Sequence, residues 1–166
     1  MTKPVLDMTA GGRMMWTNKD NELAVFVDKR KETIEFLDRG NVRVYDVKPD
    51  VLADWSDVNG LPFESGSFHQ IIFDPPHLLR AGKNSWLRKK YGVLDKVTWK
   101  QDLERGFSEA ARLLADNGTL IFKWNSDQIK LSEVLPLMPD ELVATVRNRV
   151  NKTYICVFIK KEMTDD

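Results

Sequence analysis

Short apolar runs, rich in β-branched and aromatic residues and bounded by turn residues, recur along this chain. Most are continuous rather than alternating, a pattern typical of strands that are covered on both faces in a parallel sheet. We therefore predict an α/β fold with about seven mostly parallel strands, helices on both faces, and an antiparallel end formed by the last two runs. The runs lie at 4–6, 23–27, 71–73, 119–124, 142–146 and 154–159.

Two helices and one hairpin are expected between these runs. The clearest helix begins at Thr98, which predicts a capping box with Gln101, and Gly118 is expected to end it in the left-handed conformation. A short helix is predicted at 132–137. At 33–48, two alternating runs flank a turn-rich sequence, which favours a β-hairpin over a helix.

Length and composition indicate one domain in a reducing compartment. A chain of 166 residues is typical of a single globular domain, so we expect residues 1–166 to form one unit. Cys156 is the single cysteine, which excludes an intramolecular disulfide and a multi-cysteine zinc site and favours a cytoplasmic protein. No apolar window is long enough for a membrane span or a signal peptide, so no membrane partner is expected.

Positive charge is concentrated in one segment of an otherwise balanced chain. The whole chain has 25 basic and 25 acidic residues, but 78–100 has seven bases against the single acid Asp95. Aromatic residues are interleaved with those bases, so the segment could be a loop that grips phosphates and stacks on nucleobases. The alternative is a solvated loop anchored by buried rings. The candidate nucleic-acid contacts are Lys83, Trp86, Arg88, Lys89, Lys90 and Tyr91.

The run at 71–73 leads directly into Asp74-Pro75-Pro76-His77. Two prolines after a buried strand stop its hydrogen-bond ladder and hold the backbone extended. A carboxylate and a rigid carbonyl can each accept a hydrogen bond from a planar amino group, which orients the nitrogen lone pair toward an electrophile. The alternative is a strand-ending turn with a solvated aspartate.

Small residues follow the first predicted strand, and a carboxylate ends the second. Gly11 and Gly12 would let a ligand approach the backbone closely. Asp28 could accept both hydrogen bonds of a ribose diol. Arg13 could pair with a ligand carboxylate or cap a local turn in solvent.

In this order, these features resemble the class I S-adenosylmethionine-dependent methyltransferases. The narrower likeness is to nucleic-acid amino-methyltransferases with an Asp-Pro-Pro-aromatic motif, especially small bacterial and phage members, and it covers about 5–158. The resemblance implies S-adenosylmethionine as cofactor. It assigns the methionine part to Asp7, Thr9, Gly11 and Gly12, the ribose to Asp28, the adenine amino group to Asp54 or less favourably Asp57, and the acceptor amine to Asp74, Pro75 and Pro76, with His77 beside it.

Three departures from the family pattern affect these assignments. Thr9 and Arg13 stand where two glycines of the usual first turn would be, so the backbone contact to the cofactor must be rearranged. His77 replaces a larger aromatic residue, although imidazole can still stack or donate a hydrogen bond. The segment at 12–23 leaves little room for the usual long helix.

The resulting hypothesis is methyl transfer to an exocyclic amino nitrogen of a nucleobase, adenine favoured, in DNA or RNA. One alternative is a catalytically silent nucleic-acid-binding domain, and another is a methyltransferase for a small-molecule or protein amide or amine. No metal site is predicted. The chain has two histidines, His69 and His77, and His69 lies on a strand whose side chains alternate between faces, so His69, Asp74 and His77 are not expected to surround one ion.

Overall fold

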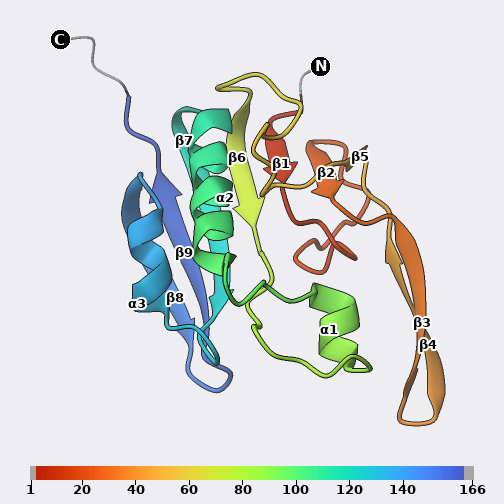
Figure 1. Cartoon of the computed structure of the whole chain (residues 1–166). Helices are drawn as coiled ribbons and strands as arrows, with labels where there is room; N and C mark the ends of the chain where they lie inside the picture. Colours follow the sequence, from red (N-terminus) through yellow and green to blue (C-terminus); the bar gives the residue numbers. More distant parts are fainter. Residues whose placement is uncertain (1–2, 163–166) are drawn as a thin grey trace.

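The computed structural model describes residues 3–162, which form a seven-stranded sheet in the order β5-β2-β1-β6-β7-β9-β8 (Figure 1). β5, β2, β1, β6 and β7 are parallel, and β9 is antiparallel to both β7 and β8. The predicted mostly parallel sheet with an antiparallel end is therefore confirmed. Its strands are β1 (Val5–Asp7), β2 (Ala24–Asp28), β5 (Val51–Leu52), β6 (Phe68–Phe73), β7 (Leu114–Asn125), β8 (Glu141–Asn148) and β9 (Thr153–Ile159).

Helices cover one face of this sheet. α2 (Trp99–Leu113) places Phe107 against Phe73 and Phe122, with ring centroids 5.5 and 4.9 Å apart. α3 (Leu131–Val134) and the 3₁₀ turn η1 (Leu135–Leu137) pack on the same apolar cluster. On the other face the connection between β1 and β2 is a loop, and its Trp16 packs edge-on against Phe26 at 4.9 Å. Of the helices predicted on both faces, the described residues place α2 and α3 together on one.

The ends of α2 differ from the predicted signals. Thr98 has helical dihedral angles and makes no capping bond, and its hydroxyl donates instead to Asp102 at 2.7 Å. The carboxylate of Asp95 accepts the N–H groups of Val97 and Thr98, so the expected capping box is replaced by an aspartate earlier in the chain. After the helix, Asn117 takes the left-handed conformation with φ 61°. Gly118 is required by space, since a Cβ there would lie 2.7 Å from the Ala115 carbonyl oxygen.

The segment predicted as a hairpin forms β3 (Glu32–Asp38) and β4 (Asn41–Val47), a two-stranded sheet of its own. It extends away from the main sheet, with α1 (Trp86–Tyr91) between the two (Figure 1). The Phe36 ring stacks on the Trp86 ring with centroids 3.5 Å apart. The hairpin therefore supports the helix that lies beyond the carboxyl ends of the central strands.

Across residues 3–162, no helix is both long and apolar enough to traverse a lipid bilayer.

Candidate functional site

A cleft with an empty volume of ≈ 770 Å³ opens where β1, β2 and β6 end. Open parallel sheets bind ligands at this edge, beyond the carboxyl ends of their strands. We call it the first cleft. Among its lining residues are the predicted site residues Asp7, Thr9, Gly11, Asp28, Asp74, Pro76, Lys90 and Tyr91.

Asp7 organises the turn that follows β1. One carboxylate oxygen accepts the Thr9 N–H at 3.0 Å, and the other accepts the Trp16 indole N–H at 2.7 Å. Burial raises the pKa of Asp7 from its ordinary 3.8 to about 6, and the nearby charges of Asp74 and Asp28 act in the same direction. The hydrogen bonds from Trp16 and Thr9 oppose that rise without cancelling it. Both oxygens are thus used within the protein.

Tyr45 of β4 explains why two glycines occur in this turn. Its hydroxyl oxygen accepts the Gly12 N–H at 2.7 Å, and a Cβ on Gly11 would lie 2.9 Å from the same oxygen. A Cβ on Gly12 would overlap the Tyr45 ring. Gly11 also has φ 49°, a conformation that side chains rarely adopt. Gly11 lines the first cleft. Gly12 does not line it and lies instead beside residues of β4, including Tyr45.

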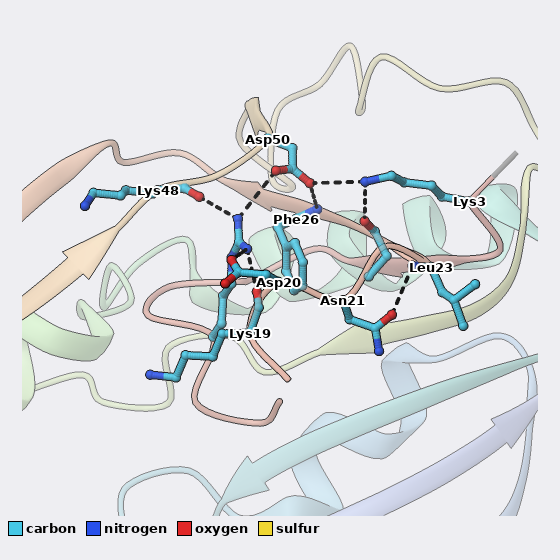
Figure 2. A network of polar contacts seen from close by, with 10 residues as sticks. Lys3, Lys19, Asp20, Asn21, Leu23, Phe26, Lys48 and Asp50 are labelled. Atoms are coloured by element: carbon cyan, nitrogen blue, oxygen red, sulfur yellow. Dashed lines mark hydrogen bonds and ion pairs between the residues drawn. The ribbon is translucent and has the colours of Figure 1, made fainter. Parts of the chain in front are cut away.

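Arg13 neither lines the first cleft, where it could pair with a ligand carboxylate, nor caps a local turn in solvent. Its guanidinium donates to the backbone carbonyls of Lys19 and Lys48, at 2.5 and 2.8 Å, and lies 3.8 Å above the Phe26 ring. Asp50 joins this network, as Figure 2 shows, by accepting the Phe26 N–H at 3.1 Å and pairing with Lys3. Arg13 therefore fastens the β1–β2 loop to the segment before β5 and does not line the first cleft.

Asp28 is buried at the end of β2 and already accepts three hydrogen bonds. They come from the Gly11 N–H at 2.9 Å, the Arg30 N–H at 2.8 Å and the Arg30 Nε at 3.3 Å. Because a carboxylate has about four acceptor positions, one remains for a ribose hydroxyl unless Arg30 moves. The other guanidinium nitrogens of Arg30 donate to the carbonyls of Lys89 and Lys90, which ties the end of β2 to α1.

Asp54 lies outside the first cleft. Its carboxylate accepts the backbone N–H and the hydroxyl of Ser56, and it lies 3.4 Å from the Lys29 ammonium. Asp57 holds a neighbouring turn by accepting two hydrogen bonds from Asn59. The adjacent Trp55 does line the cleft. The structure therefore does not bring Asp54 together with the other predicted cofactor residues.

Asp74 stands between the first cleft and a second one. Its N–H donates to the Thr9 hydroxyl at 2.7 Å, and its Oδ2 accepts a hydrogen bond from Lys123 at 2.7 Å. The second cleft lies between the Asp-Pro-Pro-His segment and the ends of β7 and β9, with an empty volume of ≈ 1080 Å³. Asp74 and Tyr91 line both clefts, while Pro75 is buried behind them.

His77 lines the second cleft as a largely buried ring. Its centroid lies 6.1 Å from that of Tyr91 and 6.3 Å from that of Trp124. Burial lowers the pKa of His77 below its ordinary value, against the opposing charges of Asp74 and Asp127. The neutral imidazole is favoured at neutral pH, which suits a flat ring beside an acceptor group.

Part of the basic segment forms α1, and some of its candidate contact residues line the first cleft while others are exposed. Trp86 stacks on Phe36, and the Lys90 ammonium lies 4.9 Å from the Tyr91 ring centroid and 5.4 Å from that of Trp86. Lys90 and Tyr91 line the first cleft. The remaining candidate contacts, Lys83, Arg88 and Lys89, are exposed.

Three residues of this site were not predicted from the sequence: Arg30, Tyr45 and Lys123. Lys123 carried a signal, because it is a single charge within the apolar run at 119–124. Arg30 and Tyr45 carried none, since their roles depend on where α1 and the hairpin pack.

Comparisons with solved structures identify the fold, although the chain has no match by sequence. No protein-family model matches the chain, and no curated protein matches it by sequence. Among solved structures, PH0226 from Pyrococcus horikoshii shares 14% identity over 95% of this chain and 81% of its own, with a TM-score of 0.60. A SAM-dependent methyltransferase from Methanosarcina mazei shares 11% identity over 96% and 92%, with 0.59. An rRNA methylase from Streptococcus thermophilus shares 14% over 95% and 87%, with 0.52. The chain therefore has the class I methyltransferase fold.

Proposed function

We propose that this protein transfers a methyl group from S-adenosylmethionine to an exocyclic amino nitrogen of a nucleobase, adenine favoured, in DNA or RNA. The observation that carries the proposal is the position of Asp74, which lines two clefts at once. A methyl transfer needs a donor site and an acceptor site that meet at one point. Structural similarity to a SAM-dependent methyltransferase and to an rRNA methylase supports the same reaction class.

The first cleft has the chemistry expected of a site for this cofactor. The charges of Asp28 and Asp74 act on Asp7, and such a group of carboxylates favours a positively charged sulfonium. Lys90 lines the same cleft and supplies positive charge for a ligand carboxylate. A side chain at Gly11 would fill the cradle beside Tyr45. The residues present therefore fit S-adenosylmethionine.

The protein's own contribution would be positioning. When bound, the cofactor would supply the methyl group: an N–CH₃ bond would form as the S–CH₃ bond breaks, the electron pair would stay on sulfur, and the proton lost from the nitrogen would pass to solvent water. Asp74 would accept a hydrogen bond from the acceptor amine and turn its lone pair toward the first cleft. The rings of His77 and Tyr91 would flank the base, and the exposed lysines of the basic segment would contact phosphates.

Replacement of Asp74 tests the proposal. We expect Asp74→Ala to lower labelled-methyl transfer to mixed DNA and RNA by about 100-fold or more, because the amine loses its orienting acceptor. Nucleoside mass spectrometry identifies the product, and calorimetry should find cofactor binding retained. Asp57→Ala, which removes a carboxylate outside both clefts, serves as the control. Full activity in Asp74→Ala would overturn the proposal.

One observation favours the silent nucleic-acid-binding domain as a second candidate. Asp28 and Asp74 are both engaged by basic side chains of the chain itself, Arg30 and Lys123. If those pairs cannot be displaced, the cofactor will not bind. Calorimetry with S-adenosylmethionine separates the two functions, because a silent domain would give no binding heat yet still retain nucleic acid on a filter.

A further inference from the structure

Lys123 is the one charged residue within the apolar stretch of β7 at 119–124. Its neighbours Phe122 and Trp124 are both buried, and Phe122 packs on Phe107 of α2, so alternation along the strand points Lys123 to the opposite face. There its ammonium lies in the second cleft, 2.7 Å from Asp74 Oδ2. The lysine therefore shares the acceptor cleft with the carboxylate proposed to hold the amine.

Lys123 and Asp74 are paired with each other rather than with the remaining charges of the cleft. The cleft's other lysine, Lys152, is bound to Asp127 at 3.1 Å. His77 is largely neutral because burial lowers its pKa. The second cleft thus contains two ion pairs, and Lys123–Asp74 is the one at its junction with the first.

This pair retains unused hydrogen-bonding capacity on both sides. Within residues 3–162, Asp74 Oδ1 accepts no hydrogen bond, since Lys123 and the Thr9 hydroxyl engage Oδ2 and the backbone N–H. An ammonium has three N–H donors, of which one is used here. The Lys123 and Asp74 side chains are 29% and 18% exposed, so both groups can be reached from the cleft. Together they present one acceptor beside a charged donor.

We propose that the Lys123–Asp74 pair selects an acceptor whose amino group adjoins an unprotonated ring nitrogen, as in an aminated heteroaromatic base. Asp74 Oδ1 accepts the amine N–H, while Lys123 donates to the neighbouring ring nitrogen. Two adjacent hydrogen bonds of opposite polarity fix both the position and the rotation of the ring, which one bond to Asp74 cannot do. This inference rests on the proposed function and names Lys123 as its specificity-determining residue.

An alkyl amine would be a poor acceptor in such a site. It offers N–H donors but no adjacent acceptor, so Lys123 would keep a desolvated ammonium hydrogen without a partner. A site built to bond a polar group discriminates strongly against analogues that lack it. The pair therefore favours a nucleobase over a lysine side chain or a polyamine.

The test pairs a change in the acceptor with a change in the protein. Short oligonucleotides containing adenine, 1-deazaadenine or 7-deazaadenine, in which a ring nitrogen is replaced by CH, are compared in labelled-methyl transfer. With the wild-type protein, we expect one of the two replacements to lower kcat/KM about 10- to 100-fold, the worth of a hydrogen bond to a charged group. In Lys123→Met the same replacement should change kcat/KM less than about 3-fold, because its partner is gone.

Controls separate this role from a structural one. Lys152→Met removes the other lysine of the same cleft and should discriminate as the wild type does, and Lys123→Arg should retain most of the discrimination because a charged donor remains. Two results would overturn the inference: equal kcat/KM of the wild-type protein for all three bases, or Lys123→Met with undiminished discrimination. In either case, methyl transfer to the oligonucleotides would still uphold the proposed function. No transfer to any oligonucleotide by the wild type overturns both.

Discussion

At the scale of single residues, the site contains a carboxyl group that is costly to ionise. Asp7 is 3% exposed, and burial raises its pKa to about 6. Its two oxygens accept hydrogen bonds from Thr9 and Trp16, which shape the turn of the first cleft. The local geometry of the cleft is thus maintained by a group whose charged form is disfavoured by its surroundings.

This arrangement predicts how stability depends on pH. Because the folded pKa of Asp7 lies above its ordinary 3.8, the folded state binds more protons between pH 3.8 and about 6, so stability falls as pH rises through that window. Asp7→Asn loses a hydrogen bond at every pH but has no carboxyl group to ionise. We expect the free energy of unfolding of the variant, relative to wild type, to rise by about 2 kcal/mol between pH 4 and 7. Urea denaturation over this range measures it, and parallel profiles would contradict it.

Sequence patterns identified three carboxylates of the first cleft because each lies at or just after the end of a strand. Asp7, Asp28 and Asp74 follow apolar runs, and the carboxyl ends of parallel strands meet at one edge. Asp54 follows the two-residue strand β5, whose turn directs the carboxylate to Ser56. Lys123 was missed because a single residue in a strand gives no indication of its partner. Pairings between distant segments depend on tertiary packing, which local patterns do not encode.

At the scale of elements, α1 depends on its neighbours for order. It has six residues and none is buried, so it cannot be stable by itself. Stacking of Trp86 on Phe36 and the Arg30 bonds to its last carbonyls attach it to the hairpin and to β2. The hairpin was predictable because alternation and a turn are local signals. Its use as a support for α1 was not, because that requires the contact between Phe36 and Trp86.

Trp86→Ala should release α1 while leaving the main sheet intact. The stacked pair contributes about 0.5–1.5 kcal/mol beyond its buried area, so local opening should become up to about tenfold more frequent. Limited trypsin digestion reads this opening, since Arg88, Lys89 and Lys90 lie within the helix. The thermal midpoint should change little. Leu87→Ala, at an exposed position of the same helix, is the matched control, and equal cleavage rates for the two variants would contradict the role of Trp86.

At the scale of the whole molecule, positive and negative charges balance in number but are unevenly distributed along the chain. The segment at 78–100 has a net charge of +6, so the rest of the chain must be −6 for the total of zero. Phosphate binding depends on local positive charge, which attracts the backbone and releases its counterions. In Figure 1 the segment lies beyond the carboxyl ends of the strands, where both clefts open. Overall neutrality is therefore compatible with a nucleic-acid substrate.

The salt dependence of nucleic-acid binding tests whether the basic segment at 78–100 contacts the phosphates. Lys83, Lys89 and Lys96 are exposed lysines of the segment, and their joint replacement by Gln removes three positive charges. For single strands each lost phosphate contact reduces the slope of log K against log salt by about 0.7, so we expect a slope about 2 units shallower. A triple variant at the exposed bases Lys19, Arg105 and Lys161, outside the segment, should keep the wild-type slope. If both triples shift the slope equally, binding follows net charge alone, and the basic segment has no particular role in holding the strand.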